Sequence, residues 1–319
     1  MGEIWGWLIV IYLFMGGLGA GAYLTSFAAG RGWIGKSPAL QRVGYYISGP
    51  IVALGTLLLV FDLGQGLKKP WLLIGLLMNP RSMMTWGVYI LACFIVVALL
   101  VGFFTWKKKE VPKAFIFVGA FLALATGTYT GLLVAVVEAV PFWNTYLMPV
   151  LFVVSALSTG ISITSILSYV MEKGQKTDER KVCKIHIVLV GAEMILLAAI
   201  FASMFTGRHG AVGAESARMI FSGSLSLPFW LLLVGVGLVI PILVFIVNYF
   251  KLSQHQSKVQ SKIEVVSAAS YEGQSKALTE EFDCSRSLLT VDAGVIIGGF
   301  ILRYVVIFAA LPIWNGVLK

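Results

Sequence analysis

Cysteine is scarce in this sequence and its spacing is wrong for a metal site. The 319 residues include three cysteines, and 12% of the residues are charged. Cys93, Cys183 and Cys284 stand far apart without a CxxC spacing. An iron–sulfur or structural zinc site takes about four ligands from one neighbourhood. We therefore expect no iron–sulfur cluster and no metal centre within this protein.

Histidine is equally scarce inside the apolar stretches. His186 stands near the start of an apolar run, whereas His209 and His255 fall in polar connections. A haem held within a helical bundle takes axial side-chain ligands from that bundle, and one histidine does not supply both. We therefore expect no intramembrane haem, so any electron transfer by this protein would take place without a metal of its own.

Apolar residues dominate what remains. They make up 58% of the sequence, with a mean hydropathy of +0.90, which is typical of an integral membrane protein. A helix needs on the order of 20 apolar residues to cross a bilayer, and eight runs of that length are present. They cover roughly residues 6–29, 44–63, 84–106, 114–137, 146–170, 185–206, 225–250 and 289–311. The sequence predicts an all-α protein with eight transmembrane helices.

The distribution of Lys and Arg predicts the orientation of these helices. Most of the 24 basic residues fall in the connections between runs one and two, three and four, five and six, and seven and eight. Since basic residues accumulate on the cytoplasmic side, both termini should face outside. This asymmetry accounts for the net charge of +9, so the charge does not indicate a nucleic-acid partner.

Several polar and aromatic residues are predicted to lie in the outer half of the bundle. Arg303 is the most informative, because a guanidinium inside a span must face a carboxylate, a polar cavity or a ligand. About 12 Å of helix separates it from the predicted outer end at Leu311, which is long for its side chain to bridge. The full set, which we expect to form one outward-facing pocket, is Tyr12, Asp62, Trp86, Tyr129, Glu138 and Arg303.

Two of these assignments, Tyr12 and Asp62, have a simpler alternative. Tyr12 fits an interfacial or packed tyrosine as well as it fits a ligand contact. Asp62 follows the usual pattern of a solvated aspartate at a helix end, although Gly64 and Gly66 would hold it near the bundle in a tight turn.

A second group of ionisable residues is predicted nearer the cytoplasmic side. Glu193 lies on the same face as His186, seven residues earlier, and Asp292 begins the last span. A buried ionisable group is a functional candidate, so these three residues form a candidate inner proton route. The alternative is a neutral glutamic acid whose hydrogen bond only ties two helices together.

The segment from Phe61 to Gly87 carries basic residues on the predicted outer side, against the general trend. Lys68, Lys69 and Arg81 stand close together in sequence there. We interpret them as a docking edge for a partner protein; a solvated surface cluster is the alternative.

Four stretches resemble the polysulfide reductase membrane subunit family, the NrfD/PsrC-like proteins. They are YLFMGGLGAGAYL, then FDLG with NPRSMMTWG, then YTGLL with PFWN and LFVVSALSTG, and finally GGFILRYVV. They occur in the family's order over most of the sequence. Two positions depart from the family pattern: Gln65 and Gly66 stand where Arg-Pro usually follows DLG, and Tyr12 stands where a quinone-contacting histidine can occur.

The resemblance implies an architecture and a set of partners. It implies two four-helix bundles, residues 1–137 with most of the quinone site and residues 138–319, which include a long cytoplasmic loop at 251–288. It also implies menaquinone or ubiquinone as the cofactor and a bacterial or archaeal cytoplasmic membrane. The partner would be an iron–sulfur subunit on the outer face, joined to a molybdopterin enzyme or a multihaem cytochrome.

These features predict the membrane subunit of a quinone oxidoreductase. Tyr12 and Tyr129 would donate hydrogen bonds to the quinone, with Trp86 as a wall of the pocket. Asp62 and Glu138 would transfer protons, and Arg303 would set the local potential. A passive anchor without a working quinone site is one alternative, and a secondary transporter, which also uses intramembrane charges, is another.

Overall fold

Ten helical elements make up the described part of the protein in the computed structural model. The structure describes residues 5–35, 37–62, 82–171, 178–206, 209–266 and 274–313. The elements are α1 (Trp7–Gly30), α2 (Pro38–Asp62), α4 (Met83–Trp106), α5 (Lys113–Ala135), α6 (Leu147–Met171), α7 (Glu179–Phe205), α8 (Gly210–Phe221), the π-helix η1 (Pro228–Val239), α9 (Ile240–Val266) and α10 (Gln274–Phe308). Eight helices in these ranges are long and apolar enough to cross a membrane, so the predicted all-α, eight-span fold is confirmed.

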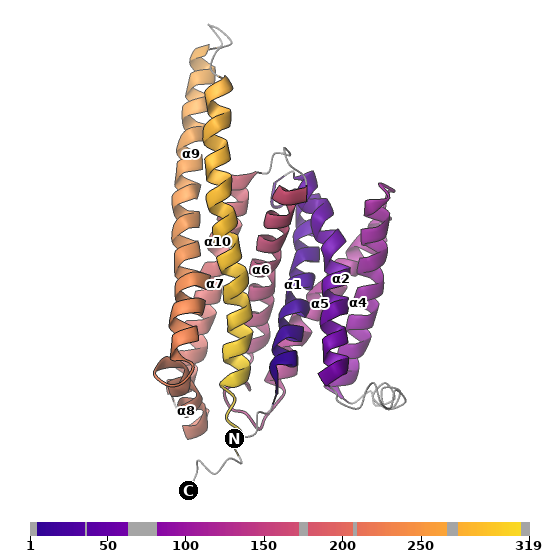
Figure 1. The fold of residues 1–319 in the computed structure, drawn as a ribbon, viewed down its shortest axis with the longest axis vertical. Helices are drawn as coiled ribbons and strands as arrows, with labels where there is room; N and C mark the ends of the chain where they lie inside the picture. The colour runs from indigo at the N-terminus through magenta and orange to yellow at the C-terminus, as the bar shows by residue number, and fades with distance from the viewer. Residues whose placement is uncertain are drawn as a thin grey trace.

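The spans run side by side and define two ends of the molecule (Figure 1). We call the end where α1 begins and α10 finishes the terminal face, because both termini lie there. The opposite end, where α2, α5 and α7 begin, is the basic face, and it carries Lys109, Lys113, Lys181 and Lys184. The distribution of Lys and Arg predicts that the basic face is cytoplasmic, and that assignment remains a prediction.

Helix contacts fall into two groups joined along α6. Contacts connect α1, α2, α4 and α5 around one side, and α6, α7, η1–α9 and α10 around the other. Helix α6 also packs on α1 and α5, and α10 touches α1. The predicted boundary at residue 137 falls in the connection between α5 and α6, and the division into two domains stays a prediction.

Two pairs of glycines let helix backbones meet directly. A Cβ added to Gly21 of α1 would overlap the Ala156 carbonyl of α6, and Gly160 lies against Gly21 in turn. Between η1 and α10, a Cβ on Gly237 would come within 2.5 Å of the Gly298 Cα. Small residues at such crossings permit close van der Waals packing in lipid, where apolar burial alone does not drive helix association.

The segment predicted as the 251–288 loop contains helix at both of its ends, and its cytoplasmic position stays a prediction. Helix α9 continues to Val266 and α10 already begins at Gln274, so both extend past the other spans at the basic face (Figure 1). The segment is polar enough to leave the membrane, but it contains no proline and only Gly273 as a strong breaker. Low hydropathy ends a span, whereas it does not end a helix.

Candidate functional site

A buried arginine lies at the junction of α10, α6 and α1. The Arg303 side chain is fully buried, and its Nη1 donates hydrogen bonds of 2.7 Å to the Ser155 hydroxyl and 2.7 Å to the Gly299 carbonyl. The guanidinium carbon also lies 5.3 Å from the centre of the Phe152 ring. Because a guanidinium has five N–H donors, these contacts satisfy only part of its hydrogen-bonding capacity.

Glu193 of α7 lies near the other two residues. Its side chain is buried, and it is close enough to Arg303 and Ser155 to interact with both. The Ser155 hydroxyl accepts a hydrogen bond from Arg303, so the three residues form one buried polar group. A buried charge is tolerated when it is paired and hydrogen-bonded. We call Arg303, Ser155 and Glu193 the charged triad.

The free side of the guanidinium faces α1. Nε and Nη2 of Arg303 have no hydrogen-bond partner among the described residues. A Cβ added to Gly17 would lie 2.8 Å from Nη2, so glycine at this position makes room for the guanidinium. The Nη2 donor therefore points toward α1.

A pair of tyrosines lies on another side of α1. The Tyr12 hydroxyl is fully buried and has no hydrogen-bond partner within the described part of the protein. Tyr129 of α5 lies close enough to interact with it electrostatically. The Tyr129 ring packs where a Cβ of Gly87 would be, which explains why glycine follows Trp86 at the start of α4.

The structure divides the predicted outer pocket into two sites. Tyr12 and Gly17 are five residues apart on α1, and five residues turn a helix by about 140° from the starting direction. Tyr12 therefore faces α5, whereas Gly17 faces Arg303. The tyrosine pair and the charged triad lie on different sides of α1, and a pocket shared by both stays a prediction.

The other residues of the predicted outer set lie at the surface or outside the described part. Trp86 is 55% exposed, and Glu138 is exposed in the turn after α5. The Asp62 side chain and the whole predicted docking edge, Lys68, Lys69 and Arg81, lie outside the described residues.

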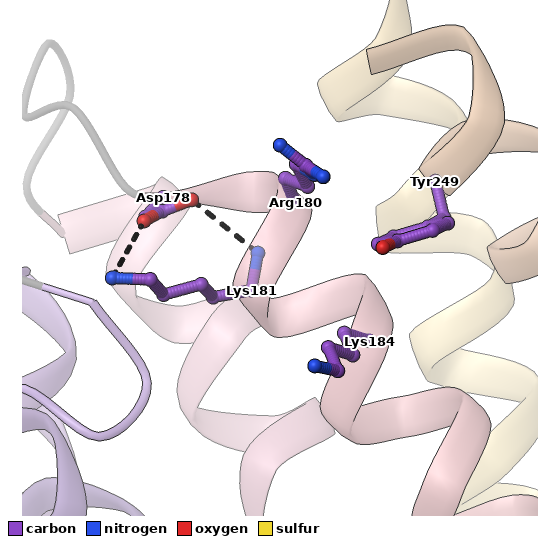
Figure 2. A pocket seen from close by; sticks show the side chains of 5 residues that line it. All are labelled: Asp178, Arg180, Lys181, Lys184 and Tyr249. Carbon is purple, nitrogen blue, oxygen red and sulfur yellow. Dashed lines mark hydrogen bonds and ion pairs between the residues drawn. The ribbon is translucent and has the colours of Figure 1, made fainter. Parts of the chain in front are cut away.

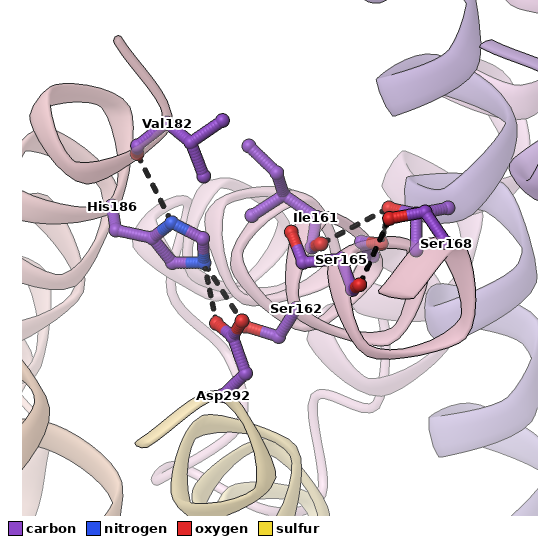
Figure 3. A network of polar contacts seen from close by, with 9 residues as sticks. Ile161, Ser162, Ser165, Ser168, Val182, His186 and Asp292 are labelled. Atoms are coloured by element: carbon purple, nitrogen blue, oxygen red, sulfur yellow. Dashed lines mark hydrogen bonds and ion pairs between the residues drawn. The ribbon is translucent and has the colours of Figure 1, made fainter. Parts of the chain in front are cut away.

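A second polar cluster lies closer to the basic face (Figure 3). Nε2 of His186 is 3.1 Å from the Ser162 hydroxyl and 3.1 Å from a carboxyl oxygen of Asp292. The other ring nitrogen, Nδ1, is 3.1 Å from the Val182 carbonyl, and the ring stacks on Phe245 at 4.3 Å. We call His186, Ser162 and Asp292 the histidine cluster.

The contacts of His186 indicate where its protons lie. The Val182 carbonyl can only accept a hydrogen bond, so Nδ1 carries a proton. Nε2 lies at ion-pair distance from Oδ1 of Asp292, and that oxygen has no hydrogen-bond partner among the described residues. Both side chains are at least 97% buried, so the histidine cluster is a protonatable pair inside the membrane span.

Helical periodicity aligns the two clusters along one interface. Ser155 and Ser162 are seven residues apart on α6, as are His186 and Glu193 on α7, and seven residues return to the same helix face about 10 Å further on. Ser158 lies between the two serines, and its buried hydroxyl has no partner among the described residues. A column of polar groups thus follows the junction of α6, α7 and α10.

Ser155 and Ser162 are functional candidates that were not among the predicted site residues. The sequence pattern that could have indicated them is a series of serines spaced three or four residues apart: Ser155, Ser158, Ser162, Ser165 and Ser168. This spacing places them along one stripe of α6.

The fold and the clusters define a multi-pass helical membrane protein with charged groups enclosed between its spans. A family model described as "Polysulphide reductase, NrfD" matches residues 1–269. The protein belongs to this family, which confirms the resemblance noted in its sequence, and it is a multi-pass protein of the cytoplasmic membrane.

Three curated relatives span bacteria and archaea. The C subunit of the polysulfide reductase of Wolinella succinogenes is 31% identical over 266 residues, which are 75% of this protein and 82% of the relative. Protein NrfD of Escherichia coli is 28% identical over 270 residues, covering 75% and 83%. The Hdr-like menaquinol oxidoreductase integral membrane subunit of Archaeoglobus fulgidus is 24% identical over 238 residues, covering 72% and 58%.

Proposed function

We propose that this protein is the quinone-reactive subunit of a membrane oxidoreductase complex. It exchanges two electrons between a quinol and an iron–sulfur subunit docked at the terminal face, and two protons are released for each quinol oxidised. Family membership and the name of the Archaeoglobus fulgidus relative support a role with menaquinol. Menaquinone is therefore the first quinone to test, with ubiquinone as the second.

The observation that carries this proposal is the unpartnered Tyr12 hydroxyl. A buried donor without an acceptor costs about 1–3 kcal/mol, and a quinone carbonyl is an acceptor that would remove this cost. Tyr129 lies beside Tyr12, so two phenols are available to hold one head-group. Both belong to residues 1–137, which we propose contain most of the quinone site.

Proton release is assigned to the carboxylates of the terminal face. Asp62 ends α2 and Glu138 follows α5, and both helices end at this face. We propose that Asp62 and Glu138 accept protons there, and that Trp86 borders the entrance from lipid. Arg303 acts from the other side of α1, where its positive charge stabilises an anionic quinone state.

The partner subunit is proposed to dock on the segment between α2 and α4. Lys68, Lys69 and Arg81 offer it a basic edge. An iron–sulfur subunit that joins a molybdopterin enzyme or a multihaem cytochrome fits the family, and docking at this edge would place its first cluster within reach of the quinone.

A second function, proton transfer across the membrane, is supported by the polar column. Protons would pass between the histidine cluster and Glu193 along hydroxyls such as Ser158, with His186 and Asp292 exchanging a proton toward the basic face. The buried, protonatable pair of His186 and Asp292 carries this proposal. Arg303 would then hold Glu193 in place through Ser155.

Replacing Glu193 with Gln tests the proton route. The change removes the titrating group, keeps its size and leaves the bond from Arg303 to Ser155 intact. We expect proton translocation by the reconstituted complex to be lost while quinol oxidation continues near the wild-type rate. Unchanged translocation, measured with a pH-sensitive dye inside vesicles, would remove Glu193 from the route.

Purification in a mild detergent tests the main proposal against its alternatives. The extract is analysed for quinone, and the protein for a co-purifying iron–sulfur subunit. We expect both. The subunit without quinone would indicate a passive anchor, and the absence of both would contradict the proposal and leave a secondary transporter as the better explanation.

A further inference from the structure

A cationic pocket lies at the basic face between α7 and α9. It has a volume of about 260 Å³ and is lined by Asp178, Arg180, Lys181, Lys184 and Tyr249 (Figure 2). Four of these residues come from the start of α7, and Tyr249 reaches toward them from α9. The pocket is far from the tyrosine pair, since it lies at the opposite end of the spans.

The charge in this pocket is only partly neutralised from within. Asp178 is occupied by Lys181, whose Nζ lies 3.3 Å from the carboxylate and whose backbone N–H donates to it at 3.3 Å. Lys184 is exposed and has no carboxylate within ion-pair distance in the described part of the protein. Arg180 lies over the Tyr249 ring, with its guanidinium carbon 5.5 Å from the ring centre. The lining of the pocket thus contains three cationic side chains and one carboxylate.

The depth of the pocket matches the level of lipid head-groups. The lining residues of α7 lie at its start, and Tyr249 lies where the apolar sequence of α9 gives way to polar residues from Lys251 onward. Tyrosine is enriched at this level of a membrane because its ring is apolar and its hydroxyl is polar. A phosphate group at the membrane surface would therefore meet Arg180 and Lys184 without leaving the lipid layer.

An apolar stripe continues from the pocket into the membrane. Lys184, Val188 and Ile195 share one face of α7 because they are four and seven residues apart. Val188 is 61% exposed and Ile195 is 71% exposed, so this face is open to lipid. A soluble anion gains nothing from such a stripe, whereas an acyl chain can pack along it.

We propose that this pocket binds the phosphodiester head-group of an anionic phospholipid, with one acyl chain along the Val188 and Ile195 face of α7. Basic pockets between helices at the cytoplasmic side of a membrane favour such head-groups. The bound lipid would connect α7 to α9 at the end of the bundle where the histidine cluster lies.

Native mass spectrometry of the full-length protein, purified in mild detergent, tests this assignment. The probes are a phosphatidylglycerol and a phosphatidylcholine with identical acyl chains. The test variant is Arg180→Gln with Lys184→Gln. The matched control is Lys109→Gln with Lys113→Gln, which removes the same charge from two exposed lysines of the same face.

We expect the wild type and the control to retain phosphatidylglycerol over phosphatidylcholine, and the test variant to bind it roughly tenfold more weakly or worse. Equal retention by the test variant and the control, or equal binding of the two lipids, would overturn the proposal. Displacement of the lipid by millimolar inorganic phosphate would also overturn it, because it would identify a site for a soluble anion.

A single substitution covers the case in which the double variant does not fold. Lys184→Gln keeps Arg180 over Tyr249, and Lys184→Arg keeps the charge. We expect added phosphatidylglycerol to raise the thermal unfolding midpoint of the wild type and of Lys184→Arg more than that of Lys184→Gln. Equal shifts in all three would contradict the assignment.

Discussion

Arg303 and Glu193 are two buried ionisable groups of opposite sign that lie close enough to interact. Removing either group alone is predicted to be costly. In Arg303→Gln the carboxylate of Glu193 loses its counter-charge inside the bundle, and breaking a buried pair in this way costs about 3–5 kcal/mol. We expect a large fall in the thermal unfolding midpoint of the detergent-solubilised protein.

The double variant Arg303→Gln with Glu193→Gln leaves no buried charge in the triad. It should recover a substantial part of the lost stability, because two neutral amides can hydrogen-bond through Ser155. A double variant as unstable as the sum of the two single variants would show that the charges do not interact.

Tyr12 is predicted to bind quinone through its hydroxyl. Tyr12→Phe removes the donor and leaves the ring, so quinol affinity should fall about tenfold, the equivalent of one hydrogen bond of about 1.5 kcal/mol. The matched control is Tyr23→Phe, which removes another buried hydroxyl of α1, one that donates to the Ile116 carbonyl. Quinol binding that falls equally in both variants would contradict a specific role for Tyr12.

At the scale of residues, the sequence marks out Arg303 and Glu193 because each is ionisable within a span, and their burial agrees with this. Hydropathy gives the depth of a residue but not the side of the helix that it faces, so it does not tell whether Arg303 and Tyr12 share one site. Ser155 gives a weaker signal, because a hydroxyl is cheap to bury when it bonds to its own helix.

The crossing of α1 and α6 is predicted to depend on Gly21. In Gly21→Ala the added Cβ would overlap the Ala156 carbonyl, so the two helices would have to separate. Gly127→Ala of α5 is the control, because its Cβ would lie 3.8 Å from Val153, an ordinary contact.

We expect the unfolding midpoint to fall clearly in Gly21→Ala and to stay level or rise slightly in Gly127→Ala, since alanine favours a helix over glycine by about 0.5–1 kcal/mol. Equal effects of the two changes, measured by thermal denaturation in one detergent, would show that the close approach of α1 and α6 is not needed.

Hydropathy predicted the number and order of the spans but not where the helices end. It detects the residues that lipid surrounds, and helix α2 already begins at Pro38, before the apolar run at 44–63. Helix ends depend instead on local signals, such as Asp178, which caps α7 by accepting from the Lys181 backbone. Helices α9 and α10 likewise continue beyond their apolar runs, because a polar sequence ends a membrane span but does not by itself end a helix.

For the whole molecule, the charge asymmetry predicts that the basic face is cytoplasmic. Single cysteines placed at Lys109 on the basic face and at Ser224, after α8, test this in intact spheroplasts. A membrane-impermeant maleimide should label Ser224→Cys and leave Lys109→Cys unlabelled until the membrane is opened. The reverse pattern would invert the orientation, and with it the side on which the partner docks.

The quinone head-group is proposed to lie against Tyr12 and Tyr129, and the rest of the proposed function depends on this position. The most direct measurement is photolabelling of the purified complex with an azido-menaquinone, followed by mass spectrometry of the labelled peptides, with and without excess menaquinol. We predict labelling of α1 around Tyr12 and of α5 around Tyr129, and loss of that labelling when menaquinol competes. Labelling confined to α7 and α10 around the histidine cluster, or labelling that menaquinol does not reduce, would contradict this position.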